Sequence, residues 1–182
     1  MSAGVLAIVV LVVIVAAAGI ALLVRPALRS NKLKRRFGPE YDRVVTAAPD
    51  KRSGEHELLD RERKHADLEL RPLEPARAAK YSERWNGVQE QFVDDPAGAV
   101  READRLVTEV MAERGYPTGG YEEQAAHLSV RHTAVLEHYR KGHEIAGRDA
   151  STEDQRTAIV HFREIFRDLL DDGHYSTEDV NA

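Results

Sequence analysis

The sequence predicts an all-α protein with one N-terminal transmembrane helix, charged spacer helices and an antiparallel bundle of about four helices. Three observations predict this: residues 3–24 are apolar and uncharged, apolar residues later recur at spacings of three and four, and no segment alternates with a period of two. The predicted parts are a transmembrane anchor (1–24), a basic juxtamembrane segment (25–36), charged spacer helices (37–72), a helical bundle domain (73–171) and an acidic tail (172–182).

The apolar segment from Ala3 to Val24 contains 22 residues. As a helix it would extend roughly 33 Å, enough to cross a hydrocarbon core of about 30 Å. Six cations follow it with no acid among them: Arg25, Arg29, Lys32, Lys34, Arg35 and Arg36. Positively charged flanks stay in the cytoplasm, so we expect a single-pass protein of a bacterial inner membrane, with its N-terminus outside and its main domain in the cytoplasm.

A cleavable signal peptide is the alternative interpretation of the same segment. Ala16, Ala17 and Ala18 supply the small residues that a signal peptidase accepts. However, no Lys or Arg precedes the apolar run, and the six cations after it would resist translocation. The uncleaved anchor is therefore favoured, and a secreted helical protein stays as the alternative.

Charge and cysteine content exclude several classes of protein. All 26 Lys+Arg and 31 Asp+Glu lie from Arg25 onward, and the chain has no cysteine. After the six juxtamembrane cations, the chain contains 20 Lys+Arg and 31 Asp+Glu, so this part has a net negative charge. Nucleic acid is therefore not expected as a partner. Without cysteine, disulfide-stapled folds, zinc fingers and thiol catalysis are excluded.

The spacer region is predicted to form two helices. Gly38, Pro39 and Glu40 favour a helix start, and Pro49 ends that helix. The stretch from Ser53 to Leu70 carries acid-then-base pairs four residues apart and only a thin apolar stripe. A solvated spacer helix is the preferred interpretation, with a partner-docking or coiled-coil helix as the alternative.

The bundle begins after the extended segment 71–75, in which two prolines disfavour helix. Its first helix is predicted over residues 75–93, and the side chains on its apolar face are Ala78, Tyr81, Trp85, Val88 and Phe92. Asp95 and Pro96 are predicted to cap and start the second helix, and Gly115 to end it.

Two further long helices are predicted after the loop at 116–120. A short helical turn from Tyr121 to His127 is expected first, followed by a helix that Ser129 caps. The last helix should start at the cap sequence 151–154 and end near Gly173. Its apolar face consists of Ile159, Phe162, Phe166 and Leu169.

No catalytic signature is present, so the histidines are the main candidates for chemistry. Four of the eight, His127, His132, His138 and His143, fall within 17 residues. Their spacings do not place two of them where they could share one ion on a helix, so that no metal or other cofactor is predicted.

One candidate ligand pocket remains, made by Trp85, His132, Tyr139 and His143. On one continuous helix, His132, Tyr139 and His143 would follow a single stripe that faces the core and the aromatic side chain of Trp85. The commoner alternative is that these histidines only hydrogen-bond inside or at the edge of the bundle.

The loop before residue 121 is a candidate contact site. Gly115, Tyr116, Pro117 and Tyr121 combine aromatic side chains with residues typical of loops, and loops of this composition often contact partners. Alternatively, Gly115 is only a helix stop and the tyrosines pack on helix ends.

Several segments resemble a family of small uncharacterised bacterial proteins, most familiar from actinobacteria and usually labelled hypothetical, membrane or secreted. The resemblance covers nearly the whole chain and implies a lineage, but no activity comes with it. The segments that carry it are 36–43, 70–73, 85–94, 103–107, 111–117, 127–132 and 150–154.

The function predicted from the sequence is a membrane-anchored, non-catalytic adaptor or scaffold that binds an unidentified protein. The lipid bilayer is the expected partner of residues 3–24, and anionic lipid is a further candidate partner of the six juxtamembrane cations. The alternative is a ligand-sensing bundle, or an enzyme of unrecognised type, that uses the His/Tyr cluster.

Overall fold

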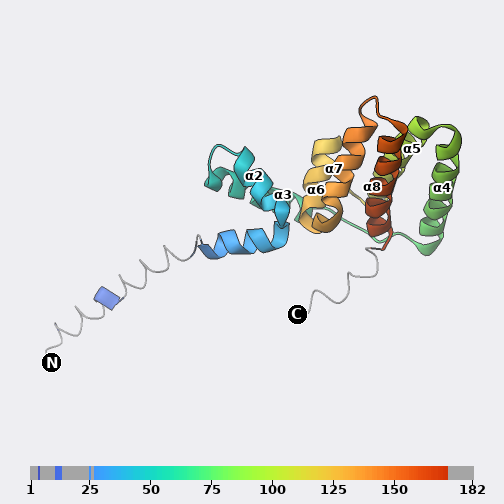
Figure 1. Ribbon diagram of the computed structural model, residues 1–182. Helices are drawn as coiled ribbons and strands as arrows, with labels where there is room; N and C mark the ends of the chain where they lie inside the picture. The colour runs from blue at the N-terminus through green and yellow to red at the C-terminus, as the bar shows by residue number, and fades with distance from the viewer. Residues whose placement is uncertain (1–3, 5–10, 14–24, 26, 172–182) are drawn as a thin grey trace. The chain divides into compact units, whose positions relative to one another are not determined.

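The structure is a computed structural model that describes residues 4, 11–13, 25 and 27–171, and all regular elements in that part of the chain are helices (Figure 1). The all-α prediction is therefore confirmed. The predicted transmembrane helix lies outside the described residues apart from 4 and 11–13, and the acidic tail 172–182 lies wholly outside them. In the described part, no helix combines the length and apolar character needed to cross a membrane.

The chain divides into two compact units, Met1–Leu58 and Leu59–Ala182, and the boundary falls within one helix. The first unit contains a helix over residues 27–37, α2 (Pro39–Ala47) and the first half of α3 (Lys51–Ala66). Gly38 separates the first two helices with a φ of 52°, and Pro39 opens α2 as predicted. The helix over 27–37 is not predicted by the sequence pattern, which indicates only a basic segment that sets the topology and could contact anionic lipid.

The start of α3 is fixed by its neighbours. The Asp50 carboxylate accepts a hydrogen bond of 2.8 Å from the Ser53 N–H, which satisfies one of the free donors of the first turn. Gly54 lets α2 and α3 approach closely, since a Cβ at this position would lie 2.8 Å from Val45 Cα. At its other end α3 stops at Ala66, four residues before the predicted Leu70.

The second unit begins its bundle with α4 (Pro75–Asp94) and α5 (Pro96–Glu113), close to the predicted bounds. Asp95 caps α5 by accepting a 2.9 Å hydrogen bond from the Gly98 N–H, and Pro96 follows as the first helical residue. On α4 the predicted face is confirmed, since Tyr81, Trp85 and Val88 are buried.

The next two helices correct the sequence prediction. The expected short turn is an 11-residue helix, α6 (Tyr121–Arg131), and α7 (Thr133–Ala146) starts only after a break at His132. Ser129 lies inside α6, where its hydroxyl donates to the Ala126 carbonyl, so its predicted role as the cap of α7 is wrong. The described bundle therefore contains five helices and not four.

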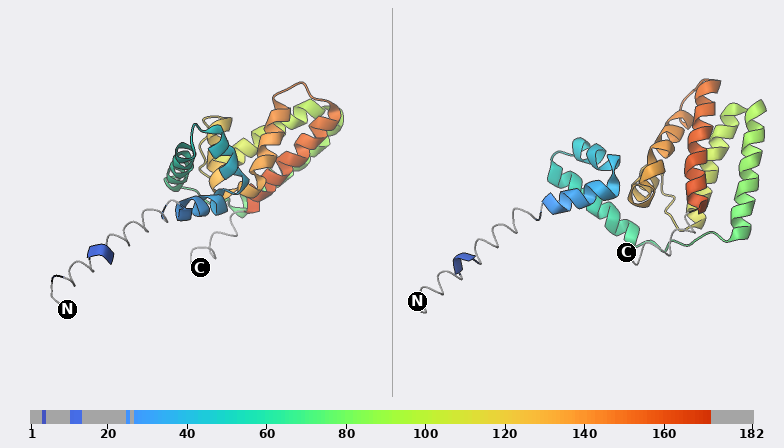
Figure 2. Two further views of the ribbon diagram at one scale, coloured as in Figure 1. Left: turned by 60° about the vertical axis from the view of Figure 1, so that its left-hand side comes forward. Right: turned by 60° about the horizontal axis from the view of Figure 1, so that its bottom comes forward.

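The last helix, α8 (Thr152–Asp171), begins as predicted, with the Ser151 hydroxyl accepting a hydrogen bond of 3.1 Å from the Asp154 N–H. It packs between α5 and α7, whereas α4 packs on α5 and α6 on α7 (Figures 1 and 2). Phe162, Ile165, Phe166 and Leu169 of α8 are buried in a core that continues through α4, α5, α6 and α7. This core belongs to the second unit, and the first unit buries a smaller set of its own: Leu33, Phe37, Tyr41, Val44 and Leu58.

The segment between α3 and α4 is extended and runs beside the end of α5. The Arg71 N–H donates to the Arg114 carbonyl at 3.0 Å. Gly115 adopts a φ of 93°, and a Cβ there would approach the Glu69 carbonyl oxygen to 2.7 Å, so both its conformation and its surroundings require glycine. Arg114 itself is buried, and its guanidinium donates to the Leu169 carbonyl of α8 at 2.7 Å.

Candidate functional site

A buried polar chain connects the loop before α6 to α8. His132, at the break between α6 and α7, lies with its Nε2 2.8 Å from the Tyr116 hydroxyl, and its Nδ1 hydrogen-bonds the Asp168 carboxylate. His132 and Tyr116 are each 3% exposed, whereas the Asp168 side chain is 36% exposed. The imidazole therefore joins three segments of the second unit inside the protein, and the carboxylate remains in contact with water.

A second polar cluster lies nearer the surface, between α5, α6 and α7. The His143 ring stacks on Tyr121 with 4.1 Å between centroids and an interplanar angle of 4°. Its Nδ1 lies 3.4 Å from a carboxylate oxygen of Asp104. Burial raises the pKa of Asp104, and the attraction of His143 only partly opposes this. The neighbouring Tyr139 donates to Gln124 at 2.6 Å, and burial raises the pKa of Tyr139 strongly.

The four residues of the predicted ligand pocket belong to three separate sets of contacts. Trp85 stacks on Phe166 of α8, with 4.7 Å between ring centroids, and His132 belongs to the buried chain with Tyr116. Tyr139 and His143 are brought together, with their ring centroids 6.2 Å apart. The expected single stripe fails because the helix is interrupted at His132, which has a φ of −111° and a ψ of 37°.

The predicted contact loop is divided between inside and outside. Tyr116 is buried against His132, and Tyr121 is half-buried under His143. Thr118, Gly119 and Gly120 are exposed, and Pro117 is half-buried. The tyrosines of this loop therefore anchor it, and the surface it offers to solvent is small and polar.

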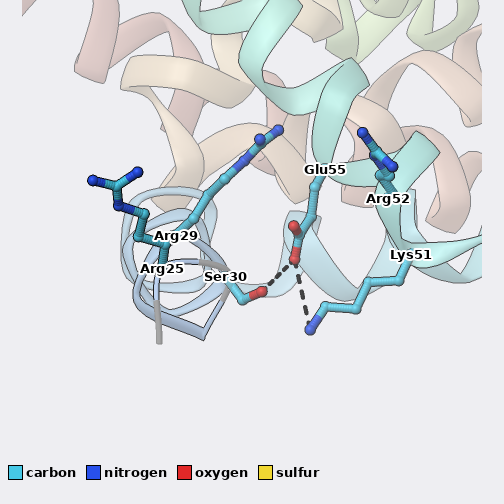
Figure 3. A pocket seen from close by; sticks show the side chains of 6 residues that line it. All are labelled: Arg25, Arg29, Ser30, Lys51, Arg52 and Glu55. Carbon is cyan, nitrogen blue, oxygen red and sulfur yellow. Dashed lines mark hydrogen bonds and ion pairs between the residues drawn. The ribbon is translucent and has the colours of Figure 1, made fainter. Parts of the chain in front are cut away.

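A cationic pocket of about 510 Å³ lies in the first unit (Figure 3). Arg25, Arg29 and Ser30 come from the segment that precedes α2, whereas Lys51, Arg52 and Glu55 come from the first turns of α3. The lining thus contains four cationic side chains and one carboxylate. The other four juxtamembrane cations, Lys32, Lys34, Arg35 and Arg36, are exposed and do not line it.

Glu55 is the fixed centre of this pocket. Its Oε1 accepts hydrogen bonds from the Ser30 hydroxyl at 2.5 Å and from the Tyr41 hydroxyl at 2.7 Å, and the Lys51 ammonium lies 3.7 Å away. Burial acts to raise the pKa of Glu55, but the two hydroxyl donors and the nearby cations outweigh it, so that this pKa is lowered. The carboxylate is therefore ionised and already bound by its own unit.

The contribution of α3 to this pocket is not predicted by the sequence pattern, which places Lys51, Arg52 and Glu55 in the charged spacer region 37–72. A signal was available in Gly38 and Pro49, since these two helix breakers allow α3 to fold back towards the juxtamembrane cations. A second missed contact is between His138 and His161, whose Nδ1 atoms lie 2.9 Å apart.

Within the described residues, no group of three or more His, Asp and Glu side chains is arranged to hold a metal ion. In comparisons with known proteins, no protein-family model, curated protein or solved structure matches the chain.

Proposed function

We propose that the chain is a single-pass protein of a bacterial inner membrane that presents a non-catalytic helical bundle to a protein partner in the cytoplasm. The apolar residues 3–24 would cross the bilayer, and the cations that follow would keep the second unit on the cytoplasmic side. The bundle would then act as an adaptor or scaffold held at the membrane.

The observation that supports the adaptor role is that polar side chains inside the bundle are hydrogen-bonded to one another. His132 bridges Tyr116 and Asp168, and Tyr139 is bound to Gln124. Each of these contacts joins different helices or a helix and a loop, so the side chains that could serve chemistry act as structural links. This supports a rigid binding module more than a catalytic pocket.

Site-directed photo-crosslinking in cells tests the adaptor role. A crosslinking amino acid would replace Asn86 on α4, Lys141 on α7 or Val160 on α8, all of which are exposed. A specific partner contacts one face, so we expect one reproducible protein adduct from one of these positions and not from the other two. Equal adducts from all three positions, or none above background, would contradict the proposal.

Topology is tested separately, with a C-terminal reporter that is active on one side of the membrane only. We expect a cytoplasmic signal together with an N-terminal fragment of unreduced mass. An exported signal with cleavage near Ala18 would instead support the alternative of a secreted helical protein.

The surface cluster of Asp104, Tyr121 and His143 supports a second candidate function, the binding of a small ligand. Its carboxylate has a raised pKa, and its imidazole side chain is 38% exposed, so a ligand could reach it. Thermal-shift measurements with divalent metals and small anions test this. A shift that the wild type shows and the His143→Ala variant lacks would support ligand binding, and no shift in the wild type would contradict it.

A further inference from the structure

We propose that the cationic pocket of the first unit binds a phosphate group. Of the six side chains that line it, Arg25, Arg29, Lys51 and Arg52 are cations from two different helical segments (Figure 3). Guanidinium groups match phosphate oxygens with paired N–H donors, and an ammonium adds a mobile point charge. The volume of about 510 Å³ is sufficient for a phosphorylated headgroup.

The carboxylate in the pocket forms a close ion pair with Lys51 and leaves the three arginines without one. Glu55 accepts from Ser30 and Tyr41 at the same oxygen that faces Lys51. Arg25, Arg29 and Arg52 form no close ion pair with a carboxylate of the described chain, although Arg29 attracts Glu55 and Arg52 attracts Asp50 at longer range. Three arginines therefore keep their donors for an anion, and the buried carboxylate fixes the two helical segments between which that anion would lie.

The N-terminus of α3 adds to the positive electrostatic potential of the pocket. The first turn of α3 contains no acidic residue, so Asp50 at the cap position offsets the positive end of the helix dipole only in part. Asp50 lies just before the helix, and its carboxylate is bound to the N–H and the hydroxyl of Ser53. The remaining donors of the first turn lie on the segment that supplies Lys51 and Arg52 to the pocket.

The position of the pocket in the chain favours a lipid as the source of the phosphate. Arg25 directly follows the apolar segment 3–24, so a spanning segment would hold the pocket at the level of the headgroups. This step rests on the proposed membrane anchor, whereas the affinity for phosphate does not. A soluble phosphate compound offers the same chemistry, and the experiment distinguishes the two sources.

The test compares two variants of the full-length chain that lose the same number of charges. Lys51→Gln with Arg52→Gln removes one wall of the pocket. Lys32→Gln with Arg35→Gln removes exposed cations that lie outside it. Native mass spectrometry of the detergent-solubilised protein would measure bound phosphatidylglycerol, and titration with pyrophosphate would measure a soluble phosphate. Amide exchange over residues 27–58 would show that the first unit is still folded.

For a lipid site, we expect the pocket variant to bind phosphatidylglycerol about tenfold more weakly and the control variant to stay within about twofold of the wild type. For a soluble phosphate, the same difference should appear with pyrophosphate. Should Lys51→Gln with Arg52→Gln unfold the unit, Arg25→Gln with Arg29→Gln gives the same comparison from the opposite wall.

Two outcomes would contradict the proposed phosphate site. Equal losses in both variants would mean diffuse attraction between charges, and no binding of either compound by the wild type would mean that no site exists. Retention of the wild type in membranes after an alkaline wash tests the anchor independently, so that failure of the pocket and failure of the anchor are distinguishable.

Discussion

Each of the two units of this chain is stabilised internally in a different way, although both are built from highly charged helices. In the first unit, a buried carboxylate, Glu55, binds the hydroxyls of Ser30 and Tyr41. In the second unit, α8 lies in a continuous apolar core, and Asp168 reaches the buried His132 from a position that water can still contact. The first unit thus combines a small set of buried apolar side chains with a buried carboxylate, whereas the second unit has a larger apolar core and buries one cation, Arg114.

This difference has an energetic consequence. Burying a carboxylate costs desolvation free energy, and its hydrogen bonds do little more than offset that cost. Each buried apolar side chain, in contrast, contributes roughly 1.5–3 kcal/mol to stability. The second unit buries more apolar side chains and should therefore supply most of the stability, whereas the first unit should depend more strongly on its polar link through Glu55.

Phe162→Ala should cause the largest loss, because Phe162 is fully buried in α8 and its ring packs against Gly142 of α7. We expect the free energy of unfolding of the second unit to fall by about 3–5 kcal/mol. Trp85 is the chain's single tryptophan and stacks on Phe166, so its fluorescence during urea denaturation reports this unit alone.

Val160→Ala is the matched control on the same helix, since Val160 is exposed. It should change the urea midpoint little. Similar losses in both variants would contradict the assignment of the core to α8.

Glu55→Ala should destabilise the first unit, because it leaves the Ser30 and Tyr41 hydroxyls without their acceptor. We expect a loss of about 1.5–3 kcal/mol, measured as faster amide exchange over residues 27–58. The Trp85 fluorescence transition should stay in place. A shift of that transition by as much as Phe162→Ala produces would show that the two units do not unfold as separate parts.

The two histidines of the predicted pocket should differ in their effect on the second unit. His132→Ala removes a buried link between Tyr116 and Asp168 and should cost about 1–3 kcal/mol. His143→Ala removes a side chain that is 38% exposed and should cost less than about 1 kcal/mol. The urea midpoints of the two variants check this order, and the reverse order would mean that the His143 cluster is the structural one.

The helices were predictable where caps and apolar spacing agree. Asp95 with Pro96 and Ser151 with its following turn fix helix starts in the structure as they do in the sequence. The prediction for Ser129 is wrong because a serine hydroxyl can also bond back to a carbonyl of its own helix, and local sequence does not show which of the two contacts forms. The helix over 27–37 was missed because its apolar residues are few and cations dominate it.

The candidate sites were less predictable, since they depend on contacts far apart in the chain. The pairing of His132 with Asp168 spans 36 residues, and that of Ser30 with Glu55 spans 25. No local spacing encodes such pairs. A break in one helix was enough to separate His132 from Tyr139 and His143, because a helical stripe exists only while the helix continues.

The smallest predicted effect is a pH dependence of the second unit that the first unit lacks. His127 is buried, and its Nδ1 has no hydrogen-bond partner in the described part of the chain. Burial lowers its pKa below the usual 6.5, Lys64 acts in the same direction, and Glu123 partly opposes them. The unfolded chain therefore takes up a proton at a higher pH than the folded one.

The stability that the neutral imidazole of His127 preserves is fully present above pH 6.5, and it is lost as the pH falls from that value through the lower pKa of the folded state. His127→Phe keeps an aromatic ring and removes the titration, so the urea midpoint of the variant should fall less between pH 7.5 and pH 5.5 than that of the wild type. Asp104, whose pKa burial raises, acts in the opposite sense but equally in both proteins. After correction for the pH dependence of intrinsic exchange, the protection of the amides over residues 27–58 should change little in the same range, because the pKa of Glu55 is lowered from 4.5 and its charge is lost only in stronger acid. Parallel midpoint curves for wild type and variant would show that His127 is not the group responsible.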